Sequence, residues 1–153
     1  MRYLFCVSLI VLLACAKDEF SKERALLEGK KWKVVAYTVN PFWTHPQTGV
    51  QYTNLLLAAE SCSADDYYRF EPENQFVQHF GEQRCSPAEP PSSATLYTLT
   101  KNQDKTWLSV SGTAFFEVQV VELTADTMRW VIPNFDMGDG QLRVANMTLV
   151  AQP

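Results

Sequence analysis

After an apolar run at its start, the chain consists of short segments in which hydrophobic and polar residues alternate between turn residues. These segments are residues 32–39, 67–70, 75–80, 95–99, 107–110, 114–123, 128–132 and 142–151. They are rich in β-branched and aromatic residues, as strands are. None has a helical period long enough to connect parallel strands. The pattern therefore predicts eight antiparallel strands.

Eight consecutive strands can close into an up-and-down barrel, and closure leaves no exposed sheet edge. Two strands change phase, because Val120 is followed by Val121 and because Leu142 and Val144 give way to Met147. A bulge absorbs such a change, and bulges bend barrel strands. We therefore expect an all-β fold, an eight-stranded antiparallel up-and-down barrel. A β-sandwich satisfies the same strand pattern.

A short helix should precede the first strand. Ser21 can cap a helix that ends near Leu27, and Gly29 suits a left-handed C-cap. The first strand should stop at Asn40-Pro41, with residues 40–60 irregular, and a second loop is expected at 81–94. Long loops inside small domains are usually functional or mobile.

The apolar start has the pattern of a signal peptide, with Arg2 before the run and a polar turn at Lys17. At its end, Leu12-Leu13-Ala14-Cys15 resembles the lipobox of bacterial lipoproteins. That resemblance implies cleavage before Cys15 and acylation of this cysteine. We expect a signal peptide at 1–14, a lipidated tether at 15–24 and a barrel domain at 25–153. A buried N-terminal helix is the alternative, but the run is short for a spanning helix.

The lipobox resemblance also implies that the protein is localised to the outer membrane. More than one acyl chain, such as palmitate, is enough to anchor a protein there stably. Ala16-Lys17-Asp18-Glu19 is similar to the signal that sends some Gram-negative lipoproteins to the cell surface. A charge run this short is also typical of a solvated tether.

The net charge of the mature chain limits the kinds of partner that it can bind. Loss of Arg2 with the signal leaves 12 basic and 17 acidic residues, a net charge of −5. This argues against nucleic acid or an anionic membrane surface as the main partner. We therefore expect the acyl chains, and not the protein surface, to attach the protein to the membrane. The sequence indicates no protein partner.

Two of the four cysteines remain once Cys6 and Cys15 are assigned to the signal and the lipid. Cys62 and Cys85, in an exported chain, favour one disulfide. A metal or redox pair is the alternative, but the chain has no Cys-x-x-Cys spacing and no histidine cluster.

Three stretches resemble the bacterial lipocalin-like lipoprotein domains. The first is similar to the lipocalin Gly-x-Trp opening with one extra residue, and the others are a cysteine-bracketed hairpin and a late turn. They are Leu27-Glu28-Gly29-Lys30-Lys31-Trp32, Cys62-x-x-Asp65-Asp66-x-x-x-Phe70 followed by Cys85, and Glu122-Leu123-Thr124-Ala125-Asp126-Thr127-Met128. The resemblance implies an eight-stranded calyx closed by a helix at one end.

Catalytic signatures are missing from the sequence. It contains no Gly-x-Ser-x-Gly elbow, no His-Glu-x-x-His motif and no phosphate-binding loop, and its only histidines are His45 and His79. His79, between Phe76 and Phe80, is typical of a barrel wall residue. We expect no enzyme activity, no cofactor and no metal.

The aromatic content exceeds what one small core must hold. The interior of an eight-stranded barrel is either filled or holds one small ligand. Trp130 shares its strand parity with Met128 and Ile132 and should face inward, whereas Trp107 either faces outward or lines a cavity wall. The candidate ligand-binding residues are Trp130, Trp107, Trp43, Tyr37, Tyr97 and Phe76.

These observations favour non-catalytic binding of a small apolar or amphipathic molecule. The alternative is an interaction module with a filled barrel, in which loops 40–60 and 81–94 bind a protein or a glycan. An open cavity would favour the ligand-binding hypothesis. A packed interior with exposed Phe42 and Trp43 would favour the interaction module.

Overall fold

The structure is a computed structural model that describes residues 18–111 and 116–152. The expected lipidation site, Cys15, lies outside these residues. The described chain contains a seven-residue helix, three single-turn helices and nine strands. The helices are α1 (Ser21–Leu27), η1 (Leu55–Leu57), η2 (Ser61–Ser63) and η3 (Pro72–Asn74). The strands are β1 (Lys31–Thr44), β2 (Gln51–Asn54), β3 (Tyr67–Glu71), β4 (Gln75–His79), β5 (Ser92–Asn102), β6 (Lys105–Val110), β7 (Phe116–Leu123), β8 (Thr127–Asp136) and β9 (Leu142–Gln152).

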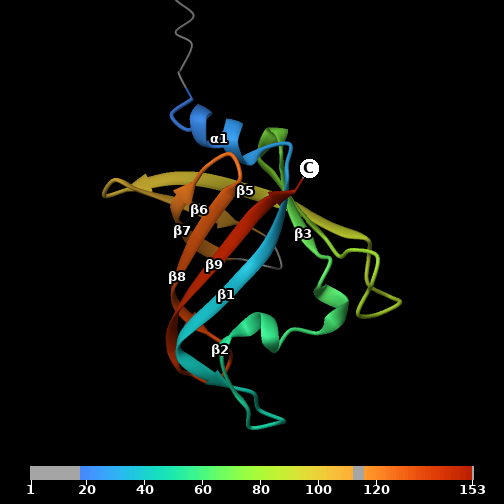
Figure 1. Cartoon of the computed structure of the whole chain (residues 1–153). Coiled ribbons are helices and arrows are strands. Elements are labelled where there is room, and N and C mark those ends of the chain that lie inside the picture. The colour runs from blue at the N-terminus through green and yellow to red at the C-terminus, as the bar shows by residue number, and fades with distance from the viewer. Residues whose placement is uncertain (1–17, 112–115, 153) are drawn as a thin grey trace, which may run out of the picture.

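Eight of these strands close a barrel (Figure 1). From β3 to β9 each strand pairs antiparallel with the next, and β1 closes the ring by pairing with both β3 and β9. The short strand β2 pairs with the far end of β1. The expected closed antiparallel barrel is confirmed, and its architecture is consistent with a lipocalin-like fold.

Strand β1 continues past Asn40-Pro41, where the sequence predicted its end. Its pairing with β9 ends at Asn40, and it pairs with β2 at Thr38 and again from Trp43 onward. Pro41 lies in the Thr38–Trp43 interval, where the register between β1 and β2 shifts and no residue of β1 is in register with β2, so a strand can hold a residue without an N–H there. The prediction that residues 40–60 are irregular throughout was therefore wrong. The second predicted loop is also shorter, because β5 begins at Ser92.

The phase change in β7 is a bulge, as expected. Val120 pairs with Trp130 and Glu122 pairs with Arg129, so Val121 is the extra residue. Its side chain is 44% exposed. The bulge keeps the apolar residues before it on the inner face.

The second predicted phase change, in β9, was wrong. Leu142 and Val144 are exposed, and the alternate residues Arg143 and Ala145 are buried, so β9 alternates regularly. The buried guanidinium is satisfied by Asp139, Gln141 and the Phe42 carbonyl. The register shifts lie instead in the ladders that join β9 to β1 and β8.

Helix α1 lies over one end of the barrel (Figure 1). Its N-cap is Phe20, without a side-chain cap, so the assignment of Ser21 as the cap was wrong. The carboxylate of Asp18 instead accepts the backbone N–H of Phe20 at 3.0 Å. Gly29 has a φ of 73°, the left-handed conformation expected after the helix.

The helix end of the barrel is packed with side chains. Trp32 is fully buried, and its Nε1–H donates to the carbonyl of Leu27 at 2.9 Å, which fastens the helix to β1. The Tyr97 hydroxyl donates to Glu28 at 3.0 Å. Other fully buried members of this core are Phe70, Leu108, Val118, Met128 and Leu149. Any ligand space inside the barrel must therefore lie away from α1.

Candidate functional site

Two adjoining cavities lie in the interior of the barrel, with volumes of about 410 and 530 Å³. Tyr37, Tyr68 and Met147 line both of them, so the cavities meet at these three side chains. Volumes of this size are usual for small-molecule sites. The barrel is therefore filled at the helix end and hollow farther along.

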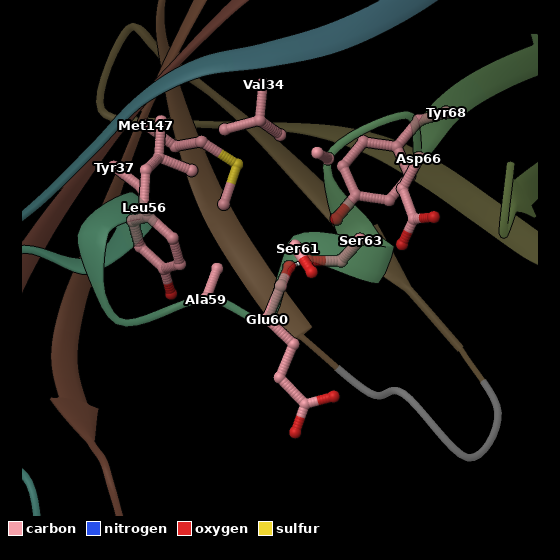
Figure 2. Close-up of a pocket in the computed structure, with 11 residues that line it drawn as sticks. Val34, Tyr37, Leu56, Ala59, Glu60, Ser61, Ser63, Asp66, Tyr68 and Met147 are labelled. Carbon is pink, nitrogen blue, oxygen red and sulfur yellow. Dashed lines mark hydrogen bonds between the residues drawn. The ribbon is translucent and has the colours of Figure 1, made fainter. Parts of the chain in front are cut away.

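The first cavity has an apolar wall and a polar rim (Figure 2). Val34 of β1 and Met147 of the neighbouring strand β9 form the apolar wall. The rim comes from the segment between β2 and β3 and includes residues of η1 and η2. Its residues are Leu56, Ala59, Glu60, Ser61, Ser63, Ala64 and Asp66.

The second cavity is mainly aromatic. The rings of Trp130 and Phe116 are 5.9 Å apart, and Tyr68 stacks on Trp130 at 6.2 Å. The ring of Phe135, which also lines this cavity, lies 5.9 Å from that of Tyr37. The indole Nε1 of Trp130 is buried and has no hydrogen-bond partner among the described residues. Rigid aromatic walls of this kind offer large apolar contact areas.

The bulge in β1 builds part of this site. Residues three apart on a regular strand face opposite sides, yet Val34 and Tyr37 both line the first cavity. The β1–β9 register shifts between Val34 and Ala36, and Val35 in this interval is 46% exposed. The extra residue therefore turns Tyr37 into the barrel.

Two tyrosine hydroxyls lie at the junction of the cavities. Burial, followed by the nearby Tyr68, raises the pKa of Tyr37, and burial also raises the pKa of Tyr68. Both phenols therefore stay neutral at physiological pH. Neither hydroxyl has a hydrogen-bond partner in the part of the chain that the structure describes. Each can donate to or accept from a bound molecule.

The carboxyl group of Asp66, on the rim of the first cavity, has a raised pKa. Burial, and then the carboxylates of Asp65 and Glu89, raise the pKa of Asp66 from 3.8 to about 6. Because the fold disfavours the charged form, the stability that this group contributes is present below its ordinary pKa and is lost as the pH rises through about 6.

Asp66→Asn should therefore raise the melting temperature at pH 8, and the difference from the unmodified protein should shrink toward pH 4. Thermal unfolding across this range measures the effect. Glu73→Gln, which removes a carboxylate in η3 near the helix end, is the control and should show no comparable trend. An Asp66→Asn difference that is the same at pH 4 and pH 8 would contradict the assignment.

Two predicted ligand-binding residues lie on the cavities. Tyr37 lines both, and Trp130 lines the second with its side chain 2% exposed. Phe76 is buried directly behind them, with its ring 5.3 Å from Tyr68 and 5.8 Å from Phe116. The structure thus brings Tyr37, Trp130 and Phe76 into one aromatic group.

The other three candidates lie elsewhere. Tyr97 is fully buried in the packed core at the helix end. Trp43 packs against His45 and Tyr52 at the far end of β1. Trp107 is half-buried on β6, where the alternate residues Leu108 and Val110 fill the interior. None of the three lines either cavity.

Sequence reasoning missed Tyr68, Met147 and the rim. Tyr68 shares strand parity with the buried Phe70, and Met147 shares it with Leu149, so alternation could have placed both inside. No such signal exists for the rim residues Glu60 and Asp66, because they lie in an irregular segment.

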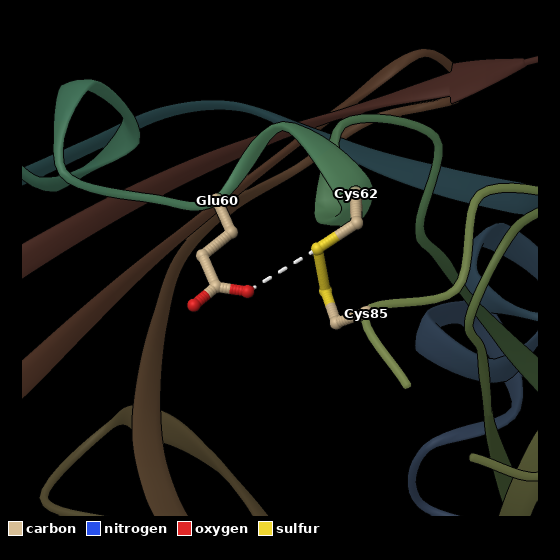
Figure 3. A group of neighbouring side chains, drawn as sticks. All are labelled: Glu60, Cys62 and Cys85. Atoms are coloured by element: carbon tan, nitrogen blue, oxygen red, sulfur yellow. Dashed lines mark hydrogen bonds between the residues drawn. A yellow bond between two sulfur atoms is a disulfide. The ribbon is translucent and has the colours of Figure 1, made fainter. Parts of the chain in front are cut away.

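The rim is fastened by a disulfide between Cys62 and Cys85 (Figure 3), in agreement with the expected pairing. The Cα atoms are 5.1 Å apart. Glu60 approaches within 3.3 Å of the Cys62 sulfur, and these three residues form a group with metal-ligand spacing. Two sulfurs bonded to each other are not thiolates, so the oxidised group is not a zinc site.

Cys85→Ser should destabilise the protein by roughly 3 kcal/mol, because the disulfide closes a loop between residues 23 apart. A lower melting temperature in thermal unfolding checks this. Cys62→Ser is the matched variant and should give the same loss, with no further loss in the double variant. Two thiols that both react with an alkylating agent in the native protein would refute the bond.

Comparisons of this chain with protein-family models, with curated proteins and with solved structures gave no match. In the described part of the chain, no helix has the length and apolar character needed to cross a membrane.

Proposed function

We propose that this protein is a lipid-anchored, lipocalin-like binding protein that holds a small apolar or amphipathic molecule in its barrel without chemistry. The observation that carries the proposal is the pair of adjoining cavities around Tyr37, Tyr68 and Met147. A barrel filled by side chains along its whole length would leave no such space.

The lining supports binding rather than catalysis. Its walls are mostly apolar and aromatic, and a few polar groups stand at one side, as in sites that orient a ligand. His79 stacks on Tyr67 at 4.4 Å and does not line either cavity. The alternative of a filled barrel with binding loops has less support, because the interior is hollow. Of the two aromatic residues named for it, Phe42 is 43% exposed as that alternative expects, whereas Trp43 packs against His45 and Tyr52.

The anchor in this proposal rests on the resemblance of Leu12-Leu13-Ala14-Cys15 to a lipobox. Acylation of Cys15 would hold the protein on the outer membrane, facing the periplasm or displayed at the surface. A barrel that binds apolar molecules would then sit beside a bilayer, where such molecules partition.

Binding is tested with N-phenyl-1-naphthylamine, a neutral fluorescent probe. Its addition should quench indole emission in a saturable way as the probe enters the aromatic cavity. Trp130→Phe should reduce this quenching strongly, whereas Trp43→Phe, which alters a tryptophan outside the cavities, should leave most of it. Absence of saturable binding of this or any other apolar probe would refute the carrier function.

The anchor is tested by Cys15→Ser. The unmodified protein should fractionate with membranes and carry acyl mass on its mature N-terminus, and the variant should become soluble or stay uncleaved. Unchanged membrane fractionation without acyl mass would contradict the lipoprotein assignment.

A further inference from the structure

The charges around the cavities are all of one sign. Glu60 and Asp66 line the first cavity, and Glu117 and Asp136 line the second. No lysine, arginine or histidine lines either one among the described residues. The carboxylate of a fatty acid would therefore meet no cation from the described chain there, and its only hydroxyl donors at the junction would be Tyr37 and Tyr68, close to the acidic rim.

Two of these carboxylates are already engaged elsewhere. Glu117 accepts the hydroxyl of Ser109 at 3.1 Å, and Asp136 accepts the backbone N–H groups of Gly138 and Gly140. Glu60 and Asp66 have no cationic partner in the described chain. Both residues lie on the rim of the first cavity, away from the apolar side chain of Val34, and the exposed carboxylate of Glu60 points away from the tyrosine rings (Figure 2).

The aromatic side chains next to this rim add an independent observation. The unpartnered hydroxyls of Tyr37 and Tyr68 lie on the cavity wall (Figure 2), and Trp130 stacks beside Tyr68. The faces of tyrosine and tryptophan attract ammonium groups, and sites for such ligands combine aromatic walls with carboxylates. The wall and the rim therefore favour the same kind of head group.

We propose that the cavity selects a cationic amphiphile, an apolar chain that carries an ammonium head group. The chain lies against Val34, Met147 and the aromatic wall, and the ammonium group lies between the tyrosine rings and the carboxylate of Asp66, with Glu60 adding negative charge at the outer rim. This inference rests on the proposed binding function and specifies its ligand class.

Protonation of the rim should oppose this binding. The carboxyl group of Asp66 has a pKa of about 6 and is surrounded by Asp65, Glu89 and the aromatic ring of Tyr68. Lys33 is the cation that acts on Asp65, whose own pKa is lowered mainly by the backbone N–H of Glu82. Below pH 6 Asp66 is neutral, so a bound cation loses one of its carboxylate partners.

Isothermal titration calorimetry with three probes that share a ten-carbon chain tests the proposal. The probes are decyltrimethylammonium, whose charge does not change with pH, decanol, which is neutral, and decanoate. At pH 8 the cation should bind about tenfold more tightly than decanoate, the usual effect of a charge-assisted contact. The affinity for the cation should fall between pH 8 and pH 5, while that for decanol stays constant.

The double variant Glu60→Gln/Asp66→Asn should abolish the preference for the cation and leave decanol binding unchanged. The control Glu73→Gln/Asp104→Asn removes two carboxylates outside the cavities and should keep the preference. Equal or tighter binding of decanoate, or a preference that survives the double variant, overturns the cation selectivity. Failure of decanol as well as the two ions to bind would overturn the carrier function itself, so the two failures are distinguishable.

Discussion

Trp32→Ala is expected to lower the free energy of unfolding by about 4 kcal/mol, the usual cost of truncating a fully buried aromatic side chain. Trp32 is fully buried in the core at the helix end. Its Nε1–H also donates to the Leu27 carbonyl, which the variant leaves without this partner. Because a domain of this size is stable by only about 5–15 kcal/mol, the variant should unfold at a much lower urea concentration.

Trp43→Ala is the matched control, because Trp43 is half-buried at the other end of the same strand. It should cost clearly less than Trp32→Ala. Trp32→Phe keeps most of the apolar volume and isolates the hydrogen bond, with an expected loss of about 1 kcal/mol. Equal losses for Trp32→Ala and Trp43→Ala would show that the helix end is not the main core.

The barrel could be predicted from the sequence because successive side chains of a strand point to opposite faces, so alternating apolar residues mark the face that is buried. Trp130 and Met128 share a parity and both are buried, and the doublet at Val120 and Val121 marks a true bulge. The course of β1 could not be predicted, because a proline such as Pro41 usually ends a strand and here falls where the register between β1 and β2 shifts.

The inner face of β9 was misread for a different reason. Leu142 and Val144 are apolar but exposed, and the buried residue between them is a charged one, Arg143. The carboxylate of Asp139, the side-chain oxygen of Gln141 and nearby backbone oxygens, which the fold brings together, make that burial possible.

The candidate site could be predicted in part. Tyr37 and Trp130 are strand residues whose side chains reach the cavities. The rim could not be placed from the sequence, because Glu60 and Asp66 lie in irregular backbone that is positioned by the Cys62–Cys85 bond. Tyr97 is aromatic and points inward, but it lies in the half of the barrel that is packed.

Val34→Phe is expected to weaken binding of N-phenyl-1-naphthylamine by at least about tenfold. Val34 lines the first cavity beside Met147, so a phenyl ring at this position occupies the space of the ligand. Stability should be unchanged or higher, because the new ring fills a hollow instead of displacing packed atoms. Probe titration and urea unfolding of the same sample measure both effects.

Val35→Phe, at the next residue, is the control. Val35 lies at the bulge with its side chain 46% exposed, so the same added volume points away from the barrel. Binding should stay within about twofold of the unmodified protein. If the two variants weakened binding equally, the probe would not be occupying the first cavity.

The most direct test of the ligand cavity is methyl NMR of the methionines during titration with N-phenyl-1-naphthylamine. Met147 lines both cavities, whereas Met128 is fully buried in the packed core. The aromatic probe should shift the Met147 methyl resonance in a saturable way and leave the Met128 resonance almost in place. A Met147 resonance that does not move while the probe binds would contradict a ligand site inside the barrel.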